Sequence, residues 1–140
     1  MFGNNGVIGS SKNVPQWIVE LIHEVEDKEE FYTEFIFFKE SKSGYRGACY
    51  HSGLESIDLY MSREKTIENI WIVLHELTHA WQHLKAPETI TKRKAGRRNR
   101  VVHNQIFFET ASRFFKKYGG PAVLEHASMW EYKRGRKYMV

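Results

Sequence analysis

Two histidines and a glutamate form the stretch with the clearest chemical potential, His75-Glu76-Leu77-Thr78-His79. On an α-helix, residues four apart lie one turn above each other on the same face. Both imidazoles can therefore reach one metal ion, at about 2.0–2.1 Å each. The carboxylate of Glu76, beside the first histidine, can reach a water on that metal without binding the metal. The pattern is typical of Zn²⁺-dependent hydrolases, in which the glutamate is the general base.

This motif needs a helix to position it, and the flanking residues predict one from about Thr66, as N-cap, to Leu84. Pro87 prevents the helix from continuing much further. The expected apolar face consists of Ile67, Ile70, Trp71, Leu74, Leu77, Thr78 and Trp81. The two histidines and the glutamate border this face, so we expect the site at the edge of a core.

A catalytic zinc site requires a third protein ligand and an open position. His83 lies one further turn along the same helix, about 6 Å beyond His79, which is too far for one tetrahedral ion to hold all three. A later helix, expected over residues 100–118, places His103 on the same face as its buried aromatic residues. Glu109 lies toward the polar side of that helix. We favour His103 as the third ligand and keep Glu109 as the alternative.

The remaining elements predict an α+β fold. A helix should begin near Asn13, as N-cap, with Pro15 in its first turn, and end near Asp27. Three stretches rich in aromatic and β-branched residues, 31–39, 45–51 and 56–61, should form a small, mostly antiparallel meander. A short helix should follow Pro121. Residues 1–12 are expected to be a flexible leader, and residues 13–140 a single domain.

Composition narrows the class of protein. A chain of 140 residues can bury one core without disulfides. Cys49 is the single cysteine, so neither an internal disulfide framework nor a cysteine-based zinc module can form within this chain. A reducing, cytoplasmic setting is therefore expected. The first residues contain no apolar signal core, and no stretch is long enough for a membrane span, so no membrane partner is predicted.

The net charge of +4 is unevenly distributed. A basic segment without acids contains Lys92, Arg93, Lys94, Arg97, Arg98 and Arg100. A second cluster lies near the C-terminus, with Lys133, Arg134, Arg136 and Lys137. Clustered cations release counterions when they bind phosphates, which favours DNA or another polyanion as a partner. The alternative is a solvated loop that keeps the protein soluble.

Several segments together resemble the SprT-like zinc metalloprotease domain, the family that includes Spartan. These are SIDLYMS, LHELTHAWQH and a later helix that opens with His103-Asn104-Gln105-Ile106-Phe107, and the resemblance extends over roughly residues 14–119. It implies a zincin-like fold in which an active-site helix is followed by a ligand-bearing helix. It also implies that His75, His79 and His103 bind zinc and that Glu76 is the catalytic acid/base.

Members of this family act on proteins bound or crosslinked to DNA, which suits the basic segment. Many of them add a cysteine-rich zinc ribbon, which this chain lacks, so it would be a minimal form. A virus-encoded relative that acts in a host cell is one interpretation. The leading hypothesis is peptide hydrolysis. A nucleic-acid- or protein-binding module with a structural or vestigial zinc site is the alternative, and hydrolysis of a non-peptide bond is a smaller third option.

Overall fold

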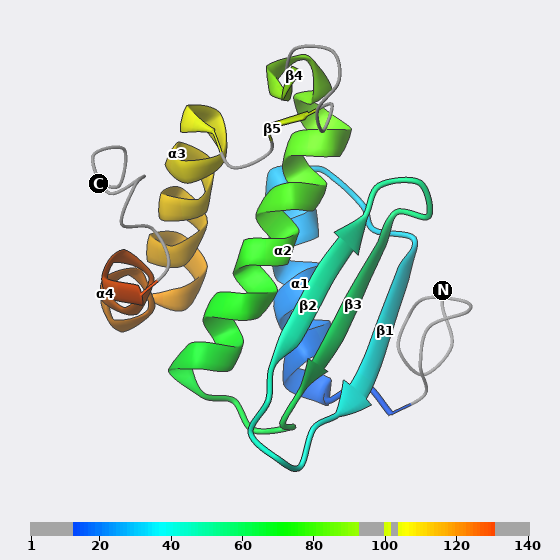
Figure 1. Cartoon of the computed structure of the whole chain (residues 1–140), viewed down its shortest axis with the longest axis vertical. Coiled ribbons are helices and arrows are strands. Elements are labelled where there is room, and N and C mark those ends of the chain that lie inside the picture. The colour runs from blue at the N-terminus through cyan, green and yellow to red at the C-terminus, as the bar shows by residue number, and fades with distance from the viewer. Residues whose placement is uncertain (1–12, 93–99, 102–103, 131–140) are drawn as a thin grey trace.

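The computed structural model describes residues 13–92, 100–101 and 104–130 (Figure 1). Within them the chain forms four α-helices, a three-stranded sheet and a two-stranded sheet, an α+β arrangement as expected. In chain order the elements are α1 (Gln16–Glu29), β1 (Phe35–Glu40), β2 (Gly47–His51), β3 (Ser56–Met61), α2 (Ile67–Lys85), the 3-10 turn η1 (Pro87–Thr89), β4 (Thr91–Lys92), β5 (Arg100–Val101), α3 (Gln105–Phe114), the π-helical turn η2 (Phe115–Gly119) and α4 (Pro121–Trp130).

The larger sheet has the strand order β1-β3-β2, with β1 parallel and β2 antiparallel to β3. The predicted, mostly antiparallel meander is therefore wrong, because the sheet is mixed and β1 does not pair with β2. Burial explains the order. Alternate side chains of β3 are fully buried and its backbone pairs on both edges, whereas β2 is largely exposed and takes an edge position.

The helices cover one face of this sheet (Figure 1). α1 lies behind the strands, while α2 runs beside β2 and separates the sheet from α3 and α4. Inward-facing residues of these elements form one core, whose most buried members include Ile18, Ile22, Ile36, Ile57, Met61, Leu74, Leu77, Phe107, Phe114 and Phe115. α2 thus lies at the centre of the described molecule, which gives its side chains fixed surroundings.

Both ends of α1 differ from the sequence-based expectation. Pro15, and not Asn13, occupies the N-cap position, and it offers no side-chain cap. The carbonyl of Pro15 accepts the first helical hydrogen bonds, so the helix begins at Gln16. At the other end, α1 continues past the expected end at Asp27 and stops at Glu29. Beyond it, the Glu26 carboxylate accepts hydrogen bonds from the backbone and the hydroxyl of Thr33. This contact holds the chain in a turn, which delays β1 until Phe35.

The later helices confirm some expected boundaries and correct others. The Thr66 side chain accepts a hydrogen bond from Asn69 N at 3.1 Å and caps α2, as predicted. α3 begins only at Gln105, because the Asn104 side chain caps it and β5 precedes it. The expected start of this helix near Arg100 is therefore wrong. The short helix α4 after η2 is confirmed.

Glu29 joins the end of α1 to the end of α3 and to η2. Its carboxylate, with only 8% of the side chain exposed, accepts hydrogen bonds from Tyr118 at 2.6 Å, Arg113 at 2.7 Å and Lys117 at 3.3 Å. Burial acts to raise the pKa of Glu29, but the hydrogen bonds and the Arg113 charge outweigh it and hold the pKa below its ordinary value.

We predict that Glu29→Gln lowers the free energy of unfolding by about 1–3 kcal/mol near neutral pH. Because the folded-state pKa lies below the unfolded-state pKa, this stabilisation is present above the unfolded-state pKa. It is lost as the pH falls through the folded-state pKa. Urea unfolding across acidic and neutral pH should therefore show a smaller acid loss of stability in the variant.

Glu24→Gln is the matched control, because Glu24 lies on the same helix and, among the described residues, forms an ion pair with Lys28 at the exposed surface. Its effect should stay below about 0.5 kcal/mol. Equal effects of the two substitutions at every pH would contradict the role assigned to Glu29.

Candidate metal centre and cleft

His75 and His79 lie one turn apart on α2 and turn their rings toward each other. Their Nε2 atoms are 3.1 Å apart. Two nitrogens that each bind one tetrahedral zinc ion at about 2.0–2.1 Å would be separated by about 3.3 Å. The donor set and its spacing therefore fit a zinc ion. The same distance also suits a hydrogen bond between one protonated and one unprotonated ring nitrogen.

Phe107 on α3 packs against both imidazoles. Its ring centroid is 5.1 Å from that of His75 and 4.4 Å from that of His79, and the residue is fully buried. This contact restricts the rotamers of the two histidines and keeps both nitrogens on one side of α2. It also brings the start of α3 next to the histidine pair.

A polar network fixes that start of α3. Asn104 accepts hydrogen bonds from Phe107 N at 3.1 Å and from Gln82 Nε2 at 3.2 Å, and donates one to the Thr89 carbonyl at 2.8 Å. Gln82 is buried on α2 and also donates to Thr89 Oγ1. Sequence reasoning missed this role of Gln82. The signal available in the sequence was an amide side chain, Gln82, within the helix that carries the motif.

Glu76 lies at the bottom of a cleft between β2 and α2. Its side chain is buried, with 8% exposed, and its Oε2 lies 3.9 Å from His75 Nε2. The cleft has a volume of about 390 Å³. Its lining residues come from the start of β2 and one side of α2, and they are Arg46, Gly47, Ala48, Glu68, Trp71, Ile72, His75 and Glu76. A ligand in this cleft would reach the glutamate and one histidine.

Arg46 gives the cleft a positioned cation that the sequence did not reveal. Asn69, fully buried at the start of α2, accepts a hydrogen bond from Arg46 Nε at 3.0 Å. The Asn69 amide in turn donates to Ser62 and to the Glu64 carbonyl. Arg46 also pairs with Glu68 at 3.4 Å. These partners are distant in sequence, so only the folded chain brings them together.

The three residues considered as a third ligand lie in different places relative to the histidine pair. His103 lies outside the described residues, and α3 begins two positions after it. Glu109 is exposed on α3 and accepts a hydrogen bond from Gln105 at 3.0 Å. The His83 ring packs 5.6 Å from Tyr50 of β2. Among the described residues, no three histidine, cysteine, aspartate or glutamate side chains converge on one point, so neither Glu109 nor His83 completes the pair.

The basic segment is described only at its ends. Lys92 pairs with Arg100 in the β4–β5 sheet, which holds the two ends of the segment together. The other four cations predicted to contact a polyanion, Arg93, Lys94, Arg97 and Arg98, lie outside the described residues. The β4–β5 sheet connects η1 to the start of α3 and so lies in the chain between the two elements that carry the site.

Comparisons with protein-family models, curated proteins and solved structures give no match. What the structure itself defines is an α+β protein with a small mixed sheet. None of the helices in the described ranges combines the length and apolar character needed to cross a bilayer. Functional inference therefore depends on the geometry of the site.

We predict that Asn104→Ala lowers the free energy of unfolding by about 1–2 kcal/mol, because α3 loses its N-cap and Gln82 loses an acceptor. Asn104→Asp should cost less, since its carboxylate can still accept from Phe107 N. Urea unfolding of both variants measures the difference. A cost of Asn104→Ala no larger than that of Asn104→Asp would show that the cap does not fix α3.

Proposed function

We propose that this protein is a zinc-dependent metalloprotease that hydrolyses peptide bonds. The observation that carries the proposal is the 3.1 Å separation of His75 Nε2 and His79 Nε2, with Glu76 beside them at the cleft. His75 and His79 would hold the ion. His103 is proposed as the third ligand from its sequence context and from the resemblance to SprT-like proteases. A zincin-like fold belongs to the same proposal.

The chemistry divides between the ion and the chain. Bound Zn²⁺ would act as a Lewis acid that polarises the scissile carbonyl and lowers the pKa of a nearby water. The Glu76 carboxylate would accept the proton of the attacking water and deliver it to the leaving amine. Phe107 would keep the two imidazoles in place. Glu76 is mostly shielded from solvent, so bulk water would compete little for its hydrogen bonds to the reacting groups.

An open cleft supports catalysis over a purely structural site. A structural zinc site fills all four positions with protein ligands, whereas a catalytic site keeps one position accessible. Here a cavity of about 390 Å³ reaches both His75 and Glu76. A binding module with a structural or vestigial zinc site is the alternative function. A hydrogen bond between the ring nitrogens of His75 and His79 would suit the vestigial case, in which zinc does not bind.

We predict that the purified protein binds one zinc ion per chain and cleaves a loosely folded protein such as casein. Glu76→Gln should retain the zinc and slow cleavage by about 10²–10⁴-fold, because only proton transfer is lost. His75→Ala and His79→Ala should lose both zinc and cleavage. Metal content and cleavage rate are measured on the same samples. Undiminished cleavage by Glu76→Gln would contradict the assignment.

His83→Ala is the control on the same helix and should retain zinc. The third ligand is tested by comparing His103→Ala with Glu109→Ala at limiting zinc. Loss of zinc from His103→Ala alone is the expected result. Loss from Glu109→Ala alone would reverse the choice of third ligand while leaving the protease proposal intact.

We also propose that the protein substrates are presented on DNA. The basic segment follows α2 and precedes α3 in the chain, and β4 and β5 hold its two ends together. A polyanion bound there would lie along the chain between the two site-bearing helices. A cytoplasmic setting, in which the exposed thiol of Cys49 stays reduced, belongs to this proposal.

We predict that duplex DNA binds with a strong dependence on salt. Replacing Arg97 and Arg98 with Gln should weaken binding at all sequences. The slope of log affinity against log salt should become shallower by about 0.9 for each lost phosphate contact. Fluorescence anisotropy over a salt series measures both quantities, and the same change at Lys65 and Lys116, which are exposed, is the control. Equal slopes for all three proteins would contradict the assignment.

A further inference from the structure

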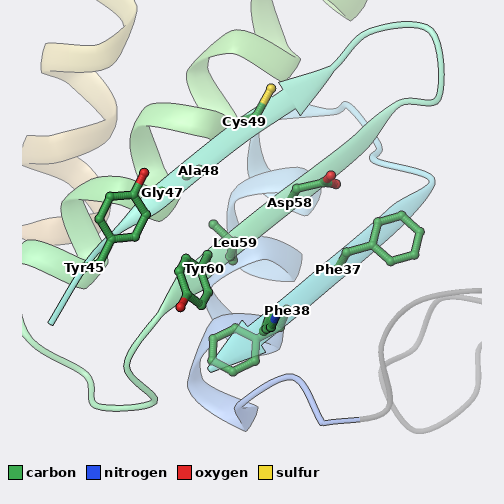
Figure 2. Close-up of a pocket in the computed structure, with 10 residues that line it drawn as sticks. Phe37, Phe38, Tyr45, Gly47, Ala48, Cys49, Asp58, Leu59 and Tyr60 are labelled. Carbon is green, nitrogen blue, oxygen red and sulfur yellow. The ribbon is translucent and has the colours of Figure 1, made fainter. Parts of the chain in front are cut away.

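The face of the sheet that the helices leave uncovered carries an aromatic hollow (Figure 2). This outer hollow has a volume of about 600 Å³. It is lined by residues from all three strands and the approach to β2, and these are Phe37, Phe38, Lys39, Tyr45, Gly47, Ala48, Cys49, Asp58, Leu59 and Tyr60. Phe37 and Tyr45 remain 37% and 63% exposed. Large apolar side chains gathered on one face are typical of a binding surface.

Strand register explains why these side chains gather. Phe37 of β1 lies opposite Asp58 of β3, which in turn lies opposite Cys49 of β2. The next outward row joins Lys39, Tyr60 and Gly47 in the same way. Successive residues of a strand point to opposite faces, so Phe38 and Leu59, which lie between these rows, are buried in the core. The outer hollow therefore lies on the face of the sheet opposite the core.

The outer hollow and the cleft meet at the start of β2. Gly47 and Ala48 line both of them. Because both residues are small, no large side chain separates the two cavities at this point. The Tyr45 ring lies across Gly47, where a Cβ atom would come within 3.3 Å of it, and stands 5.6 Å from the Tyr60 ring. A ligand that leaves the cleft at this point meets Tyr45 first.

The strand order makes such a path available to a polypeptide. β2 is at the end of the sheet and pairs only with β3 among the described strands. An extended segment that lies along β2 would direct alternate side chains to opposite faces of the sheet. One of them would then point toward the outer hollow while the backbone remains near the cleft.

The charges in the outer hollow favour a peptide side chain over a nucleobase. Lys39 and Asp58 are its charged lining residues, and their charges are opposite. Lys39 lies 5.8 Å from the Tyr60 ring, while Asp58 pairs with His51 at 3.0 Å. Binding of single-stranded nucleic acid combines aromatic stacking with a positively charged groove. The hollow supplies the aromatic rings and lacks the excess of positive charge.

We propose that the outer hollow is a specificity subsite that binds a large apolar or aromatic side chain of the polypeptide in the cleft. This inference rests on the proposed function, because it assumes that the cleft binds polypeptide. Such a subsite would select segments whose apolar residues are accessible, as they are in loosely folded proteins. Tyr45 and Phe37 form its two walls, and Gly47 with Ala48 forms the passage from the cleft.

The test uses short fluorescein-labelled peptides of one sequence with Phe, Leu, Ala or Asp at a single guest position. Binding to the zinc-loaded Glu76→Gln protein is measured by anisotropy, so no cleavage occurs. The guest is moved along the peptide to find the preferred position. We expect the Phe and Leu peptides to bind about tenfold more tightly than the Ala peptide, which corresponds to burial of one large side chain.

Tyr45→Ala and, as a second variant, Phe37→Ser should remove this preference, so that the Phe, Leu and Ala peptides bind with the same affinity. Tyr32→Ala is the matched control, because Tyr32 is 48% exposed and lies outside both cavities. Thermal unfolding confirms that the variants fold. An unchanged preference in Tyr45→Ala and Phe37→Ser would overturn the proposal.

Two further results separate this inference from its alternatives. If the two substitutions weaken binding of single-stranded oligothymidylate and leave the peptide preference intact, the outer hollow binds nucleobases and the proposal is overturned. If the protein prefers Phe peptides through Tyr45 and never hydrolyses a protein, the subsite stands and the proposed protease activity fails. Hydrolysis without a preference that depends on Tyr45 overturns the subsite alone.

Discussion

The Phe107 ring packs against the imidazoles of both His75 and His79, and this contact links the geometry of the site to the core. Because Phe107 is fully buried, α3 cannot move along α2 without opening a cavity in the core. The hydrogen bonds of Asn104 to Gln82 and Thr89 fix the same juncture from the polar side. Two independent contacts therefore hold the start of α3 near the histidine pair.

The strand order of the sheet is the second feature that determines the geometry of the site. The buried strand β3 pairs on both sides, which leaves β2 at the edge beside α2. This edge strand opens with two small residues, Gly47 and Ala48, and both line the cleft together with Glu76. Asn69 accepts a hydrogen bond from Arg46, which also lines the cleft. The same residues that stabilise the fold thus determine which groups a ligand in the cleft would meet.

Sequence patterns predicted the features that depend on local periodicity. Thr66 and the apolar repeat located α2, and the histidine spacing placed two nitrogens within reach of one ion. The mixed strand order could not be predicted, because it depends on which strand buries most surface. Likewise, only contacts between distant residues fix the cap at Asn104. A third ligand must come from another element, so local periodicity leaves it as a hypothesis.

The central claim is that His75 and His79 bind one zinc ion with a third histidine and an open position. X-ray absorption at the zinc edge of the zinc-loaded protein tests it most directly, because it reports ligand type and distance. We expect three imidazole nitrogens at about 2.0–2.1 Å and one further light atom. A sulfur at about 2.3 Å, which only the cysteine or a methionine could provide, or a failure to retain zinc would contradict the claim.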